Sequence, residues 1–144
     1  MIILDTNIVS EFMTSLPSNS VLEWLNAQHS VDLYLTTISI AEIGFGLRVM
    51  SKGKRQQLLA DRFEQFIAMG FESRLLSFDE AAARVYGEIK GCRQEVGRPL
   101  SDLDAQISSI ARINRFAVAT RNIKDFEECG IELINPFDFN PSSP

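Results

Sequence analysis

Three carboxylates stand at comparable places along the 144-residue chain, and together they could hold a metal ion. Asp5 directly follows the apolar run Ile2–Leu4, which is typical of a buried strand. Open α/β sheets place their ligand sites at the carboxyl ends of strands, and an isolated carboxylate that is buried there needs a partner such as a cation. Glu42 and Asp104 each begin a segment with helical periodicity. The combination predicts a metal-dependent enzyme.

The setting of the second and third acids also has a structural explanation. Ser39 and Ser101 precede Glu42 and Asp104 by three residues, which is the spacing of a capping box, and acids in a first helical turn favour the helix dipole. For either helix taken alone, capping is the stronger explanation. Three acids at the margins of apolar stripes favour a shared site, and capping is compatible with metal binding because first-turn position fixes the side chain.

Asp102 competes with Asp104 for the third position. Helix geometry separates the two side chains by about 200°. Asp104 is expected on the same side as the apolar residues Leu103, Ile107 and Ala111, whereas Asp102 points further from that stripe. We therefore assign Asp104 to the site and Asp102 to a solvated position at the start of the helix.

A fourth polar segment follows the strand predicted at residues 116–120. Asn122 could orient a water molecule, and Asp125 could hold the loop or extend the acidic cluster. An ordinary polar loop after a strand explains this segment equally well. The residues predicted to assist the three acids are Thr6, Asn7, Thr120, Asn122 and Asp125.

The chemistry of these side chains favours particular metals. Oxygen ligands select Mg²⁺ or Mn²⁺ over zinc. Such an ion lowers the pKa of bound water and stabilises charge on a phosphodiester. The only histidine, His29, lies in a polar stretch and is expected at the surface. Any catalysis is therefore expected to proceed without a histidine base.

Strand-like and helix-like apolar patterns alternate along the chain. Strands are predicted at residues 2–4, 31–38, 74–78, 116–120 and 131–134. Helices are predicted after Ser18 or Ser20, at residues 39–50, after the basic turn at residues 52–55, from Asp79 to Gly97, and from Ser101 to about Asn114. This alternation predicts an α/β fold with a mostly parallel central sheet that is flanked by helices.

Length and composition fit one domain, predicted at residues 1–139 and followed by a flexible C-terminal tail at residues 140–144. The net charge of −5 argues mildly against nucleic-acid binding, although a bound cation would restore local attraction. We expect no membrane partner, since the chain shows neither a transmembrane run nor a signal peptide. Cys92 and Cys129 are expected to be reduced thiols in a cytoplasmic protein.

The polar segments resemble the motifs of the PIN-domain ribonucleases, specifically the VapC toxins and their FitB-like relatives. Asp5, Glu42 and Asp104 match the three acidic positions of that family, whereas Asn122 stands where the family has a fourth acid. This departure weakens the case for a second metal ion, and Asp125 does not clearly replace the missing acid. The matching segments follow the family order over nearly the whole chain, at residues 3–10, 39–46, 99–107 and 119–126.

The resemblance implies a PIN-like three-layer fold, a homodimer and hydrolysis of RNA that depends on Mg²⁺, with Mn²⁺ as a substitute. It also implies inhibition by a cognate antitoxin of the VapB or FitA type, and a larger toxin–antitoxin assembly that the antitoxin attaches to operator DNA. Contacts to RNA phosphates are then expected from Arg48, Lys52, Lys54 and Arg55, or alternatively from Arg93, Arg98, Arg112 and Arg121. The first group is equally well explained as a solvated helix end and turn.

Other functions compete with the nuclease. A catalytically silent PIN-like interaction module could use the acids to hold an arginine of an antitoxin or regulator. A phosphoacceptor signalling domain would need a lysine at the end of the last strand, and residues 131–135 contain none. A haloacid-dehalogenase-like phosphatase would need a second aspartate at the position of Asn7.

Overall fold

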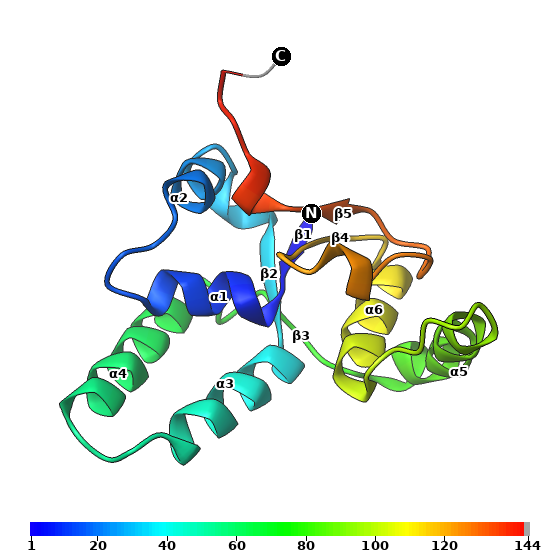
Figure 1. Cartoon of the computed structure of the whole chain (residues 1–144), viewed down its shortest axis with the longest axis horizontal. Coiled ribbons are helices and arrows are strands. Elements are labelled where there is room, and N and C mark those ends of the chain that lie inside the picture. Colours follow the sequence, from blue (N-terminus) through cyan, green and yellow to red (C-terminus); the bar gives the residue numbers. More distant parts are fainter. Residues whose placement is uncertain (143–144) are drawn as a thin grey trace.

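The computed structural model describes residues 1–142, and its centre is a five-stranded sheet with the order β3-β2-β1-β4-β5 (Figure 1). Every neighbouring pair of strands is parallel. The predicted α/β class is therefore confirmed, and the sheet is parallel throughout. The strands are β1 (Ile2–Leu4), β2 (Leu33–Thr36), β3 (Leu75–Leu76), β4 (Ala117–Ala119) and β5 (Leu133–Ile134).

Six α-helices cover the two faces of this sheet, four on one face and two on the other (Figure 1). Side chains alternate between the faces along a strand. Leu4 accordingly packs into the core beneath the first four helices, whereas Ile3 packs with residues of the last two. The helices are α1 (Thr6–Met13), α2 (Asn19–Asn26), α3 (Thr37–Val49), α4 (Lys54–Ala68), α5 (Glu80–Glu95) and α6 (Asp102–Asn114).

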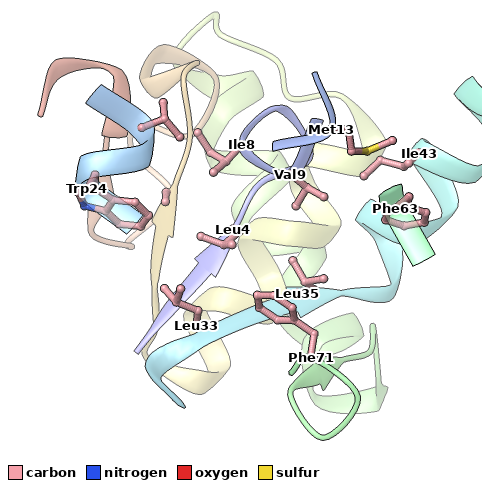
Figure 2. Packing of buried hydrophobic residues seen from close by; sticks show 12 residues of the cluster. Leu4, Ile8, Val9, Met13, Trp24, Leu33, Leu35, Ile43, Phe63 and Phe71 are labelled. Atoms are coloured by element: carbon pink, nitrogen blue, oxygen red, sulfur yellow. The ribbon is translucent and has the colours of Figure 1, made fainter. Parts of the chain in front are cut away.

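The larger core cluster fixes the first four helices against β1 and β2. Figure 2 shows Met13, Ile43 and Phe63 gathered where α1, α3 and α4 meet. Trp24 of α2 is 4% exposed and extends the same cluster. Burial of large apolar side chains such as these contributes roughly 1.5–3 kcal/mol each. The apolar periodicity of residues 21–25 thus correctly predicted a helix that packs on the sheet.

Helix α1 was not predicted from the sequence. Its segment begins with Thr6 and Asn7 and continues with the β-branched Ile8 and Val9, all of which have modest helix propensity. Tertiary packing overrides that preference, since Ile8 and Val9 are completely buried. Asp5 is the N-cap of this helix, and its side chain accepts the N–H of Thr6.

The boundary between β2 and α3 differs from the prediction. Residues 30–32 form a 3-10 turn, and α3 already begins at Thr37, so the strand predicted at 31–38 is half as long. The N-cap is Thr36, whose Oγ1 accepts the N–H of Ser39 at 3.1 Å. The predicted capping role of Ser39 is therefore wrong, and Glu42 lies in the second turn instead of the first.

The other predicted boundaries agree better with the structure. Asp79 and Ser101 cap α5 and α6 as predicted, and Gly97 follows α5 with a φ of 75°. Strand β1 has the predicted bounds, whereas β3, β4 and β5 are shorter than predicted. Two further 3-10 turns cover Ile123–Asp125 (η2) and Pro136–Asp138 (η3).

Within residues 1–142, no helix is both long enough and apolar enough to cross a membrane. Of the predicted tail, residues 140–142 are exposed, and the N–H of Ser142 is donated to the side chain of Asn140 at 2.9 Å. Residues 143 and 144 lie outside the described part of the chain.

The corrected cap of α3 gives a testable prediction. Thr36→Val keeps the side-chain shape but leaves the buried N–H of Ser39 without its acceptor, so it should lower the free energy of unfolding by about 1–2 kcal/mol. Thr36→Ser keeps the hydroxyl group and should lose less than half of that. Urea unfolding monitored by circular dichroism measures both, and equal losses would show that the cap is not the reason for the effect.

Candidate active site

The three acids predicted from the sequence line one cavity of about 420 Å³ at the carboxyl edge of the sheet. Asp5 ends β1, Glu42 comes from α3 and Asp104 from the first turn of α6. In a parallel α/β sheet the helices run back against the strands, so the starts of α1, α3 and α6 gather at this edge. The remaining residues around the cavity are Thr6, Asn7, Ser10, Glu11, Thr14, Asn122 and Asp125.

Asp5 is 5% exposed, and hydrogen bonds fix both of its carboxylate oxygens. Oδ1 accepts the backbone N–H of Thr6 at 2.8 Å. Oδ2 accepts the hydroxyl of Thr120 at 2.8 Å and the side-chain amide of Asn7 at 3.3 Å. The parallel pairing of β1 with β4 brings Thr120 next to Asp5, because Leu4 lies opposite Ala119 and these two residues directly follow them.

Thr6 joins the first two acids. Its backbone N–H binds Asp5, and its hydroxyl donates to Oε1 of Glu42 at 3.0 Å. The hydroxyl oxygen also lies 2.9 Å from that of the buried Ser39. Ser39 therefore helps to orient the Glu42 side chain instead of capping its helix.

Asp104 and Asp102 lie in different surroundings. Asp104 is partly buried beside the cavity, and its backbone N–H is donated to the hydroxyl of Ser101 at 3.2 Å. Asp102 is exposed, outside the cavity, and bonded to Lys90 and to the hydroxyl of Tyr86. The structure thus brings Asp104, and not Asp102, into the neighbourhood of Asp5.

Burial disfavours the charged form of the three carboxyl groups when no cation is bound. Desolvation raises the pKa of Asp5 to about 6, and the negative charges of Asp104 and Glu42 add to this effect. Burial likewise raises the pKa of Glu42 and of Asp104, helped by Asp104 in the first case and by Asp125 in the second. A divalent cation would reverse this penalty, so the set of oxygen donors suits Mg²⁺ or Mn²⁺.

The acids share a cavity but are not drawn into a closed shell of ligands. Among residues 1–142, no three Asp, Glu, His or Cys side chains have the arrangement of a ready-made metal site. The only histidine, His29, is exposed beside a different hollow, between α2 and α4. The chemistry of this cavity therefore rests on oxygen groups alone.

The predicted auxiliary residues form a chain of contacts behind the acids. The side-chain oxygen of Asn7 accepts the N–H of Arg121 at 3.2 Å, and its amide reaches Thr120 at 3.4 Å. Thr120 is completely buried, and its hydroxyl oxygen accepts the N–H of Asn122 at 3.0 Å. Asn122 and Asp125 both line the cavity.

Some expectations about the surroundings were wrong. Leu103 was placed on the apolar stripe beside Asp104, yet it is 41% exposed. Arg93 was considered for RNA contacts, yet it is 4% exposed and bonded to backbone carbonyls. Arg98 and Arg112 pair with Glu127 and Glu88.

Sequence reasoning also missed the contribution of α1. Ser10, Glu11 and Thr14 line the cavity, and Glu11 accepts the N–H of Ser18 at 2.8 Å. The four-residue spacing of Thr6, Ser10 and Thr14 was an available signal, since it places three hydroxyl groups on one helix face.

A larger groove of about 550 Å³ adjoins the acidic cavity and shares Thr6, Ser10, Thr14 and Glu42 with it. It lies among α1, α3 and α4. Its charged residues besides Glu42 are Arg55 and Arg62, and its apolar lining consists of Met13, Ile43, Leu47, Met50, Leu58 and Leu59.

Comparison with known families and sequences gives consistent matches over the whole fold. The family model for the PIN domain matches residues 2–131. The plasmid stability protein StbB of Pseudomonas syringae pv. tomato is 40% identical over 96% of this chain and 99% of its own length. The VapC ribonuclease Y4jK of Sinorhizobium fredii is 37% identical with the same coverage. Toxin FitB of Neisseria gonorrhoeae is 34% identical over 95% of this chain and 99% of its own length.

Solved structures give a similar result. The structure of FitAB bound to an IR36 DNA fragment contains a chain that is 32% identical, with a TM-score of 0.89. The match covers 99% of this chain and all of the other.

The buried carboxylate predicts how stability depends on pH without metal. The folded protein holds the Asp5 proton up to about pH 6, whereas an unfolded chain releases it near the ordinary value of 3.8. The stability associated with this group is therefore complete below about pH 4 and is lost as the pH rises to about 6. Asp5→Asn removes this dependence, so its stability relative to the parent should rise over that interval, by about 3 kcal/mol.

Urea unfolding in the presence of a chelator, at several pH values from about 4 to 7, measures this difference. Asp102→Asn is the control, because Lys90 lowers the pKa of Asp102 below its ordinary value, so the stability of that variant relative to the parent should stay nearly constant above about pH 4. A constant difference between Asp5→Asn and the parent would contradict the role of Asp5 burial.

Proposed function

Because the chain belongs to the PIN-domain family, and within it to the VapC/FitB toxins, we propose that it is the toxin of a type II toxin–antitoxin system and acts as a Mg²⁺-dependent endoribonuclease. The observation that carries this proposal is the convergence of three partly or fully buried carboxylates, Asp5, Glu42 and Asp104, on one cavity. The names of two relatives, VapC ribonuclease and toxin FitB, support the reaction and the biological role. We further propose that residues 1–139 form a single PIN domain in a cytoplasmic protein.

In this proposal Asp5, Glu42 and Asp104 hold the cation. Mg²⁺, when bound, supplies a Lewis acid that lowers the pKa of water and offsets charge on the phosphodiester. Thr120 and the Thr6 backbone keep the Asp5 carboxylate oriented, and the Thr6 hydroxyl does the same for Glu42. The Asn122 side chain at the edge of the cavity can orient the attacking water by hydrogen bonding. The arrangement needs no histidine base.

RNA would reach this site across a rim of exposed cations. Arg48, Lys52 and Lys54 are exposed around the turn between α3 and α4, and Arg55 lines the adjoining groove. On the opposite side, Arg121 stacks on the ring of Phe137, with 4.6 Å between the guanidinium carbon and the ring centroid. Stacking holds a guanidinium in place while its N–H groups stay available for phosphate.

The groove beside the acids suits an antitoxin of the VapB or FitA type. Its apolar lining fits the apolar face of an amphipathic helix, and the three acids would attract an arginine or lysine that follows the helix. The FitAB structure that contains the similar chain is bound to a DNA fragment. By analogy, we propose a homodimer of this chain that joins operator DNA through its antitoxin.

A catalytically silent interaction module is the second candidate, and Asn122 favours it. An asparagine at this position removes one negative charge from the edge of the cavity. Such a module would still bind an antitoxin, so only a cleavage assay separates the two functions.

RNA cleavage by the purified, antitoxin-free protein tests the nuclease directly. Asp5→Asn and Asp104→Asn should each reduce the rate by about 100-fold or more, since even groups that only orient metal ligands typically contribute 10–100-fold. Asp102→Asn should retain most activity, because that side chain lies outside the cavity. Metal-independent cleavage, or a parent as inactive as the Asp5 variant, would overturn the proposal.

Inhibition by the antitoxin gives a further prediction. Replacing the antitoxin arginine that faces the acids with alanine should restore nuclease activity more than it weakens the complex, because the helix in the groove supplies much of the affinity. Titration calorimetry and the cleavage assay measure the two effects. A structure of the complex with the acidic cavity open to solvent would contradict this mode of inhibition.

A further inference from the structure

Arg93 is a buried cation near the end of α5, and its N–H groups donate hydrogen bonds to backbone carbonyls of two other segments. Its Nε donates to the carbonyl of Arg98 at 2.7 Å. Its Nη1 donates to the carbonyls of Asp125 at 3.1 Å and Glu127 at 2.9 Å, and lies 3.8 Å from the sulfur of Cys129. No salt bridge involving Arg93 occurs within residues 1–142. Burying a cation in this way is costly, so the contacts to the backbone carry its structural role.

The first of these segments leads into α6. The N–H of Arg98 returns to the carbonyl of Arg93 at 2.9 Å, so the two residues are bonded in both directions. Gly97 between them has a φ of 75°, which permits the chain to reverse. Leu100 is then buried, and Ser101 caps the helix that carries Asp104. Arg93 therefore fixes the connection that delivers the third acid.

The second segment is the loop at residues 121–130, which carries Asn122 and Asp125. Its only regular structure is the single turn η2. Carbonyl groups outside regular structure need other donors, and a guanidinium can supply several in a fixed fork. Arg98 adds a second contact from the surface, since its Nη2 donates to the carbonyl of Lys124 at 2.9 Å.

We propose that Arg93 is a positioning residue of the acidic site, which ties the loop of Asn122 and Asp125 to the segment that leads into Asp104. The inference rests on the proposed metal-dependent function, but it concerns how one wall of the cavity is held together. Loss of the contacts should loosen one wall of the cavity while β1, α1 and α3 remain in place.

The test compares Arg93→Met, which removes the donors, and Arg93→Lys, which keeps the charge, with the parent. Arg84→Met is the control, because Arg84 is exposed on the same helix and pairs only with Glu80. Hydrogen exchange reports on the N–H groups of Asp125 and Phe126, which bond within η2. Mn²⁺ affinity is measured by calorimetry, without RNA and well below the melting temperature of each variant.

Both Arg93 variants should exchange these two amides faster and bind Mn²⁺ about 10–100-fold more weakly, as expected when a group that orients metal ligands is removed. Arg84→Met should match the parent. If Arg93→Met folds and shows the amide exchange rates and Mn²⁺ affinity of the parent, the proposal is overturned. Parental exchange rates and Mn²⁺ affinity in Arg93→Lys would also overturn it, because a positive charge without the guanidinium group would then be sufficient. If Arg93→Met does not fold, Arg93→Lys and Arg98→Met decide: unchanged exchange and affinity in both would overturn the proposal.

The same measurements separate this inference from the proposed function. A parent that binds Mn²⁺ but cleaves no RNA would refute the nuclease, while weaker Mn²⁺ binding in the variants would still support the role of Arg93. A parent that binds no Mn²⁺ would refute the metal site and the role of Arg93 together.

Discussion

The burial of the Asp5 carboxyl group is the physical constraint on which the site depends. Asp5 ends the central strand, where burial and two neighbouring acids raise its pKa to about 6. The parallel pairing of β1 with β4 supplies the Thr120 hydroxyl, and the first turn of α1 supplies the Thr6 N–H. These two donors stabilise the charged form of the carboxyl group, whereas burial and the neighbouring acids destabilise it. In the proposed function, a bound cation would offset this electrostatic cost.

The two sides of the cavity are built by different means. On one side, β1 and β2 lead directly into α1 and α3. The Thr6 hydroxyl of α1 contacts the side chains of Ser39 and Glu42 of α3. On the other side, a loop with a single 3-10 turn presents Asn122 and Asp125 to the cavity. A loop of this kind does not hold its own position through a ladder of backbone hydrogen bonds. The guanidinium of Arg93 provides the missing donors from the neighbouring helix.

Features that depend on local sequence could be predicted, and features that depend on distant partners could not. The caps Asp79 and Ser101 act on the amides of their own helices and were found correctly. The start of α3 was misjudged because the run from Thr36 to Ile38 has strand propensity, although Thr36 acts as a cap. Helix α1 was missed because its stability comes from burial. The contacts of Arg93 could not be predicted because its backbone acceptors lie 5 to 34 residues away along the chain.

The central claim is that Asp5, Glu42 and Asp104 together bind a divalent cation. Crystals of the antitoxin-free protein soaked in Mn²⁺ test it directly, because anomalous scattering locates the ion without assumptions about its ligands. We expect a strong anomalous peak in the cavity at the carboxyl end of β1, within coordination distance of Asp5 and of at least one of the other two acids. A peak elsewhere on the molecule, or a cavity without a peak at saturating Mn²⁺, would contradict it.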